Sequence, residues 1–295
     1  MKIAVLLVSL ATAVACGPSG DAPLPPTPVP ARGPGVVSAP DGQPIVYNVA
    51  GQGTPALVFI HGWMCNQRFW TEQFDAFSAE HTVVTLDLPG HGASGKDRGI
   101  WTLAAYGEDV KAVIDHLGLE RVILIGHSMG GPVALEAARL MPQRVIGVIG
   151  VDTFQDVSWE WNPEEMDPFI AALEKDFPAT CGDFVTTMFL EDADPKLVER
   201  VRTDMCSGQP EVGVALMKQF AGYDEAAALA AVHVPVRCVN STMWPTNVEG
   251  NRSYHEDFDV VTMDGVDHFL MMEKPEAFDE HLRKAIAEID HADGS

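Results

Sequence analysis

The segment around Ser128 constrains the fold more than any other part of the chain. An apolar, β-branched run at 122–125 leads into GHSMG (126–130), and residues 131–140 are rich in Ala and Leu, as in a helix. A Gly-x-Ser-x-Gly motif between a strand and a helix is typical of a nucleophile elbow, a sharp turn that exposes a serine. The two glycines would remove side chains that clash in such a turn. We therefore predict Ser128 as a nucleophile, the simpler alternative being a serine that caps a helix.

Further apolar runs alternate with amphipathic stretches on both sides of this motif. Strands are predicted at 56–60, 81–86, 122–125, 145–151 and 236–240, after a hairpin of 36–38 and 45–49, with helices at 68–77, 103–117 and 131–140. This alternation indicates an α/β fold whose mostly parallel central sheet has helices on both faces. Functional residues gather at the carboxyl ends of strands in such sheets. Ser128, Trp63 and Asp152 each follow such an end.

About eighty residues separate Asp152 from the strand predicted near Val234. They contain four helical stretches, at 163–177, 181–190, 194–205 and 211–220. A structureless loop of this length is unusual in a compact domain. The sequence therefore predicts an inserted helical unit at 153–231, between core segments 35–152 and 232–295.

The N-terminus has the pattern of an export signal. Lys2 precedes an uncharged apolar run that is too short to span a bilayer, so residues 1–15 are predicted as a signal peptide. The end of that run, AVACG (13–17), resembles the lipobox of bacterial lipoproteins, which implies lipidation of Cys16. The alternative is ordinary cleavage with Cys16 incidental. Residues 16–34 are rich in proline and predict an extended tether. The expected location is the bacterial cell envelope, as a lipoprotein, or alternatively the secreted fraction.

The net charge and the cysteines of the chain limit which partners and cofactors are expected. The formal net charge of −23 disfavours nucleic acid and anionic membrane surfaces, so a lipid anchor would be the only membrane contact. Export permits disulfides, and Cys181 and Cys206 both lie in the predicted insertion, so we expect them to pair. Cys238 lies in an apolar run and is expected to be a small buried side chain. No cysteine or histidine spacing typical of a metal site occurs, and no cofactor is implied.

Four motifs in this order resemble those of the α/β-hydrolase fold family. They are HGW (61–63), DLPGHGAS (87–94), GHSMGG (126–131) and GVDHF (265–269). The resemblance runs from about residue 36 to the end and places the insertion where the family has a cap. It implies that Ser128 is the nucleophile and His268 the general base, and that the backbone N–H groups of Trp63 and Met129 form the oxyanion hole.

The residues around His268 agree with this assignment, but the acid departs from the family pattern. His268 follows a strand-like run at 260–263, and histidine is the side chain that titrates near neutral pH. The family usually carries its acid after the seventh strand, where this chain reads NSTMWPTN (240–247) and has no carboxylate. Some members carry it after the sixth strand, where Asp152 lies. We therefore predict Asp152 as the acid. Asp267 is a competitor, although its position beside His268 disfavours contact with that ring.

These inferences predict an exported serine hydrolase, similar to esterases and lipases, that cleaves small carboxylic esters through an acyl-enzyme. Trp159 in the cap, with Trp244 and Met271 near the loops, is expected to line an apolar substrate pocket. The same machinery cleaves amides, lactones, thioesters or carbon–carbon bonds in other proteins of this fold. A ligand receptor without turnover and an inactive scaffold also stay open. The oligomeric state is not indicated.

Overall fold

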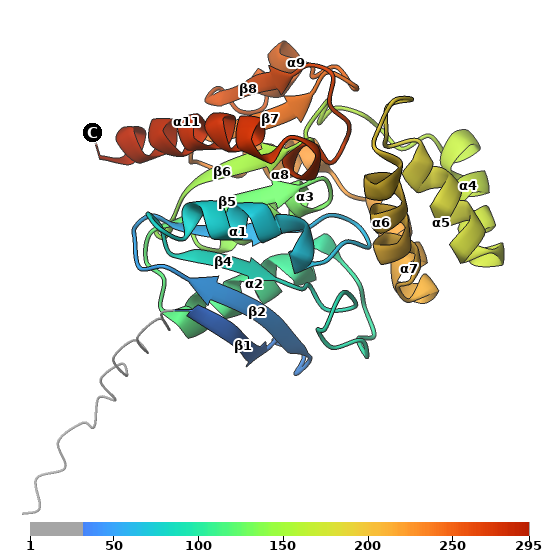
Figure 1. Cartoon of the computed structure of the whole chain (residues 1–295), viewed down its shortest axis with the longest axis horizontal. Helices are drawn as coiled ribbons and strands as arrows, with labels where there is room; N and C mark the ends of the chain where they lie inside the picture. Colours follow the sequence, from blue (N-terminus) through green and yellow to red (C-terminus); the bar gives the residue numbers. More distant parts are fainter. Residues whose placement is uncertain (1–31, 295) are drawn as a thin grey trace, which may run out of the picture.

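The computed structural model describes residues 32–294 (Figure 1). The predicted signal peptide, Cys16 and the tether up to residue 31 lie outside the described residues, so these stay predictions. Within residues 32–294, no helix is long and apolar enough to cross a membrane.

An eight-stranded sheet forms the centre of the molecule. Its strands are β1 (Arg32–Ser38), β2 (Pro44–Ala50), β3 (Ala56–Ile60), β4 (Val83–Leu86), β5 (Val122–His127), β6 (Val145–Val151), β7 (Val236–Ser241) and β8 (Phe258–Met263). They follow the order β1-β2-β4-β3-β5-β6-β7-β8. All pairs from β4 to β8 are parallel, and only β1 and β2 run antiparallel to their neighbours. The predicted mostly parallel sheet is confirmed.

Helices cover both faces of the sheet, as Figure 1 shows. On one face, α1 (Thr71–Phe77), which continues the 3₁₀ turn η1 (Gln67–Trp70), packs against α11 (Pro275–Asp293). On the other face, α3 (Gly130–Leu140) contacts both α2 (Leu103–Leu117) and α8 (Glu225–Ala230). Strands β3, β4, β5 and β6 are buried at every residue, as expected of strands covered on both faces.

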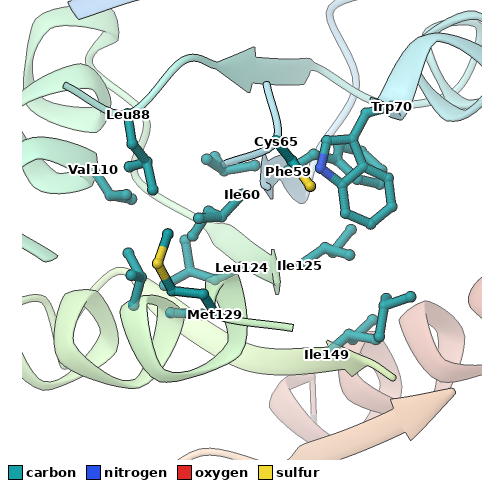
Figure 2. Packing of buried hydrophobic residues seen from close by; sticks show 14 of the residues in the cluster. Phe59, Ile60, Cys65, Trp70, Leu88, Val110, Leu124, Ile125, Met129 and Ile149 are labelled. Atoms are coloured by element: carbon teal, nitrogen blue, oxygen red, sulfur yellow. The ribbon is translucent and has the colours of Figure 1, made fainter. Parts of the chain in front are cut away.

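The hydrophobic core holds the predicted elbow in place. Phe59 and Ile60 of β3 and Leu124 and Ile125 of β5 are fully buried, and Figure 2 shows them packed between the two helical layers together with Met129. Burying a side chain of this kind stabilises the fold by about 1.5–3 kcal/mol. The turn that carries Ser128 therefore follows one fully buried strand, β5, and lies beside another, β3.

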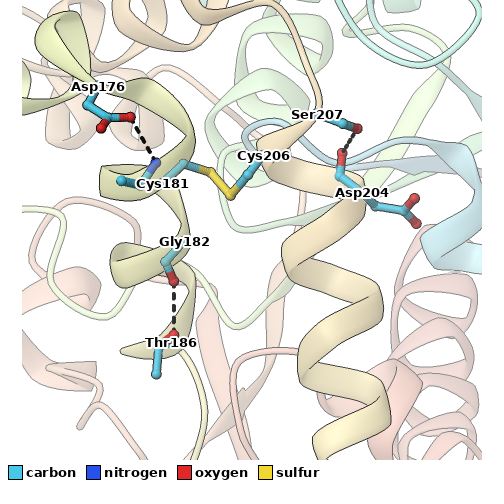
Figure 3. Close-up of a disulfide and its surroundings, with 8 residues drawn as sticks. Asp176, Cys181, Gly182, Thr186, Asp204, Cys206 and Ser207 are labelled. Carbon is cyan, nitrogen blue, oxygen red and sulfur yellow. Dashed lines mark hydrogen bonds between the residues drawn. A yellow bond between two sulfur atoms is a disulfide. The ribbon is translucent and has the colours of Figure 1, made fainter.

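Four helices inserted between β6 and β7 form a cap. They are α4 (Pro163–Lys175), α5 (Phe177–Thr186), α6 (Pro195–Cys206) and α7 (Pro210–Phe220). Each carries a proline in its first turn, where the missing N–H costs nothing. A disulfide joins Cys181 of α5 to Cys206 of α6, the pair expected from the sequence (Figure 3). The predicted insertion also includes α8, which packs on α3 of the core rather than on the cap.

The N-terminal strand begins earlier than the hairpin prediction. Strand β1 already includes Gly33 and Pro34, which fall in the predicted tether, and Pro34 lies opposite Asn48 of β2. Proline usually interrupts a strand because it has no N–H to donate. An edge strand tolerates it, because half of the N–H groups of an edge strand have no neighbouring strand to bond. Three short helices were also not predicted, namely α8, α9 (Val248–Arg252) and α10 (Leu270–Glu273).

Candidate active site

Ser128 lies in a strained turn directly after β5. Its backbone φ of 51° is in the left-handed region, which residues other than glycine rarely adopt. Its N–H donates to the carbonyl of Val151 at 3.0 Å. A Cβ at Gly126 would lie 2.1 Å from the Gly130 carbonyl oxygen, and one at Gly130 would lie 2.4 Å from that of Ile60. Both glycines of the motif are therefore required by close backbone approach.

The loop after β3 passes against this serine. A Cβ at Gly62 would lie 3.2 Å from the Ser128 Cβ. His61 fixes the loop, because its Nε2 accepts from the Leu88 N–H at 3.0 Å and its Nδ1 donates to the Gly62 carbonyl at 2.8 Å. Burial lowers the pKa of His61 to about 4, so this ring is neutral. Within residues 32–294, the backbone N–H groups of Trp63 and Met129 have no hydrogen-bond acceptor.

His268 lies between β8 and α10 and is bonded to Asp152 at the end of β6. The Nδ1 of His268 and the Oδ2 of Asp152 are 2.6 Å apart. The second oxygen of Asp152 accepts from the Ser241 N–H at 2.7 Å. Because a carboxylate only accepts, Nδ1 carries a proton, and in the neutral form of the ring Nε2 is therefore the acceptor. His268 and Ser128 line the same cavity.

The backbone of His268 is fixed from two sides. Its N–H donates to the carbonyl of Met188, just after α5, at 3.1 Å. Its carbonyl accepts from the Nε2 of His127 at 2.9 Å. Burial holds the pKa of His127 well below its usual value, so this ring is neutral and can donate through only one nitrogen. Trp244 lies edge-on to the His268 ring, with 5.1 Å between centroids.

Asn240 and Ser241 are site residues that the sequence analysis did not identify. Strands β6 and β7 are neighbours, so Asp152 projects over the carboxyl end of β7. The Nδ2 of Asn240 donates to the Thr153 carbonyl at 2.9 Å. This bond fixes the backbone directly after Asp152, and Asp152 itself has a left-handed φ of 45°. The signal was present in the sequence: a polar pair ends an apolar strand where the family usually carries its acid.

Asp267 does not take the place of Asp152. Its Oδ1 accepts from the Phe269 N–H at 2.8 Å, while its Oδ2 is buried without a partner among the described residues. Burial, with Glu273 nearby, raises the pKa of Asp267 to about 7.

A cavity of about 1180 Å³ opens over Ser128, between the core and the cap. Trp159 and Trp244 line it as expected. Met271 does not: it is fully buried, and its carbonyl accepts from Gln73. Its helix, α10, packs against α1 and α11, which turns this methionine into the core. The prediction that Met271 lines the pocket is therefore wrong.

The remaining cysteines within residues 32–294 are buried and do not form a metal site. Cys65 and Cys238 are free and buried, as expected for Cys238. Within the described part of the chain, no group of three or more His, Cys, Asp and Glu side chains could hold a metal ion.

Comparison with known sequences identifies the family. The sequence model of the Alpha/beta hydrolase family matches residues 57–281, most of the chain. The chain belongs to this family. Both the fold class and the family predicted from the motifs are thus confirmed.

Relatives of this alpha/beta hydrolase include enzymes with named substrates. It is 27% identical to 3-oxoadipate enol-lactonase 2 of Acinetobacter baylyi over 79% of this chain and 88% of the lactonase. It is 32% identical over 64% of its length to the dihydrolipoyllysine-residue acetyltransferase component of the acetoin cleaving system of Pseudomonas putida, but spans only 47% of that protein. A hydrolase from Pseudomonas aeruginosa PA01 has a similar structure, with a TM-score of 0.72, 25% identity, and 84% and 96% of the two chains covered. The family, the enol-lactonase and the structurally similar hydrolase support a hydrolase.

Proposed function

We propose that this alpha/beta hydrolase cleaves carboxylic esters through a covalent acyl-enzyme, with Ser128, His268 and Asp152 as its catalytic residues. One observation carries the proposal. The 2.6 Å bond between Asp152 and Nδ1 of His268 leaves Nε2 as a proton acceptor in the cavity that Ser128 also lines. A serine hydroxyl needs such a base to become nucleophilic near neutral pH.

In the proposed reaction, Nε2 of His268 takes the hydroxyl proton as Oγ of Ser128 attacks the ester carbonyl. The tetrahedral intermediate collapses, the carbon–oxygen bond to the alcohol breaks, and His268 gives its proton to the leaving alkoxide. Water then attacks the acyl carbon while Nε2 of His268 takes one of its protons. The bond from the acyl carbon to Oγ breaks, His268 returns the proton to Ser128, and the carboxylic acid leaves. Asp152 keeps Nδ1 protonated throughout and stabilises the imidazolium that forms.

The oxyanion of the intermediate needs donors that are not used elsewhere. The N–H groups of Trp63 and Met129 fit this role, because both belong to segments beside Ser128 and neither has an acceptor within residues 32–294. Losing one such donor costs about 3 kcal/mol in the transition state of comparable enzymes.

The first test replaces the nucleophile. Ser128→Ala is expected to lower the hydrolysis of a short p-nitrophenyl ester by at least about 10³-fold, because no other group can form the acyl-enzyme. Thermal unfolding should stay nearly unchanged, since alanine fits the same space. Release of p-nitrophenol and differential scanning calorimetry measure the two effects.

Ser253→Ala is the matched control, because this hydroxyl is exposed and donates only to the Gly250 carbonyl. A fluorophosphonate should label the native protein and Ser253→Ala but not Ser128→Ala. Many turnovers per molecule would separate an enzyme from a receptor or an inactive scaffold. Full activity of Ser128→Ala would exclude this nucleophile.

Lactone hydrolysis is a second candidate. The lactonase relative matches over most of both chains, and a lactone is a cyclic ester that the same steps would open. Parallel assays of one lactone and one linear ester of equal carbon number separate the two functions. A kcat/KM that is much higher for the lactone would favour the second candidate.

A further inference from the structure

The charges that line the cavity have one sign. Besides Asp152, three acidic residues line it, Glu160, Asp224 and Glu225, and none of its described lining residues is Lys or Arg. Two of the four carboxylates are already bonded, because Asp152 binds His268 and Asp224 caps α8 through the Ala227 N–H at 2.8 Å. Glu160 and Glu225 therefore give the cavity a negative charge that no lining side chain compensates.

Glu225, in the first turn of α8, is partly buried, whereas Glu160 is exposed. Glu225 has no ion pair or hydrogen bond within the described part of the chain, and burial raises its pKa to about 7. The nearby groups do not compensate it. The hydroxyl of Tyr223 donates to Glu136 at 3.2 Å, and Arg139 is paired with that same glutamate at 2.6 Å. The Cys238 thiol is neutral, because burial raises its pKa.

Aromatic rings form much of the remaining lining. The side chains are Phe154, Trp159, Trp161, Phe184, Phe220, Tyr223, Trp244 and Tyr254. Trp159 and Trp161 meet edge to face at 6.3 Å, and Trp159 is 59% exposed, a large apolar surface left open to solvent. The face of an aromatic ring attracts cations, most strongly for tryptophan. Rings and carboxylates therefore favour the same kind of ligand.

We propose that this cavity selects esters that carry a positively charged ammonium group, held between the tryptophans and the carboxylate of Glu225. This inference rests on the proposed ester hydrolysis and names its substrate class. An ester with an anionic group is disfavoured, because it would lie beside unpaired carboxylates with no cation to pair with. The net charge of −23 adds an attractive long-range field for cationic substrates.

Three p-nitrophenyl esters of equal chain length test the proposal, with acyl chains that end in trimethylammonium, tert-butyl or sulfonate. The first two have the same shape and differ only in charge. We expect kcat/KM for the ammonium ester to exceed that for the tert-butyl ester by roughly tenfold, and the sulfonate ester to be the poorest substrate. Equal values for the first two esters, or a preference for sulfonate, would overturn the proposal.

Variants locate the effect. Glu225→Gln and Trp161→Leu should each reduce the ratio of the ammonium ester to the tert-butyl ester by several-fold. Glu280→Gln is the matched control, because it removes one charge from an exposed position on α11, outside the cavity, and should leave the ratio unchanged. A ratio that responds equally to Glu225→Gln and Glu280→Gln would contradict a local role for Glu225.

The pH dependence of the same ratio gives an independent measurement. Glu225 ionises near pH 7, whereas the trimethylammonium group does not titrate, so the ratio should rise between about pH 6 and pH 8. Both esters are cleaved by the same catalytic residues, so the pH dependence of the chemical steps cancels in the ratio. In Glu225→Gln the ratio should be flat, and a rise of the same size there would contradict the assignment.

Binding separates failure of this inference from failure of the proposed function. If the protein hydrolyses the tert-butyl ester without preferring the ammonium ester, only the substrate class is wrong. If it hydrolyses no ester, calorimetric titration of Ser128→Ala with hexyltrimethylammonium and with hexanesulfonate still tests the cavity. We expect binding of the cation alone, and binding of the sulfonate instead would overturn the inference.

Discussion

At the residue scale, Asp152 is the least ordinary part of the candidate site. It follows β6, while β7 contributes only a backbone N–H, that of its last residue Ser241, to the carboxylate of Asp152. Adjacent parallel strands end at the same edge of the sheet, so a carboxylate from either strand can reach the same imidazole. An acid at the end of β6 can therefore make the same hydrogen bond to His268 as an acid at the end of β7.

Asp152→Asn should lower kcat for a p-nitrophenyl ester by roughly 10⁴-fold, because an amide in place of the carboxylate favours the wrong tautomer of His268. Its shape is unchanged, so the melting temperature should move little. Asp267→Asn is the matched control and should keep most of the activity, since that carboxylate binds the backbone of Phe269 rather than the ring of His268. Loss of activity only in Asp267→Asn would reverse the assignment of the acid.

At the element scale, the cap depends on its disulfide. The bridge joins α5 to α6 across 25 residues of sequence, and the turn between these helices contains Met188, whose carbonyl holds the backbone of His268. The cap helices and the loop that carries the candidate base are therefore mechanically connected.

Replacing both Cys181 and Cys206 with alanine should lower the free energy of unfolding by roughly 3 kcal/mol, as expected for a crosslink that closes a loop of this length. Urea denaturation measures this loss. Limited proteolysis should become faster between α5 and α6, and kcat/KM should fall. Cys65→Ala removes a buried thiol without removing a crosslink and serves as the control. Equal proteolysis rates in both variants would mean that the cap does not need the bridge.

Elements with strong periodicity could be predicted from the sequence, and short elements held by tertiary contacts could not. Helix α2 and strand β6 have the predicted bounds, because amphipathic spacing and a continuous apolar run define them locally. Helix α10 has four residues, and its burial against α1 and α11 decides where Met271 points. The role of Asn240 likewise depends on which strand lies beside β7. These facts arise from packing, which no local pattern encodes.

At the scale of the whole molecule, buried titratable groups set how stability depends on pH. The folded state raises the pKa of Asp267 and Glu225 to about 7, so it retains their protons between about pH 4 and 7, where the unfolded chain has lost them. Stability therefore falls as pH rises through this window. Burial lowers the pKa of His61 to about 4 and of His91 to about 3, which makes stability rise with pH up to about 6.5.

Below about pH 6.5, the carboxyl groups make stability fall with rising pH while the histidines make it rise. Above about pH 6.5, only the effect of the carboxyl groups on stability remains. The melting temperature should therefore fall by a few degrees between about pH 6.5 and 8, which calorimetry can follow. Repulsion within a chain of net charge −23 acts in the same direction. Asp267→Asn should reduce the fall, because it removes one of the two carboxyl groups. A melting temperature that rises over this range would contradict the explanation.

The position of Asp152 also has a consequence for how such a protein can change over generations. In this chain the stretch from Thr242 to Asn247 carries no carboxylate, yet it brings Trp244 to the wall of the cavity. Substitutions or insertions there could reshape ligand preference while the proton-transfer residues stay where they are. A separation of this kind lets natural or laboratory selection explore new ligands at little risk to the underlying chemistry.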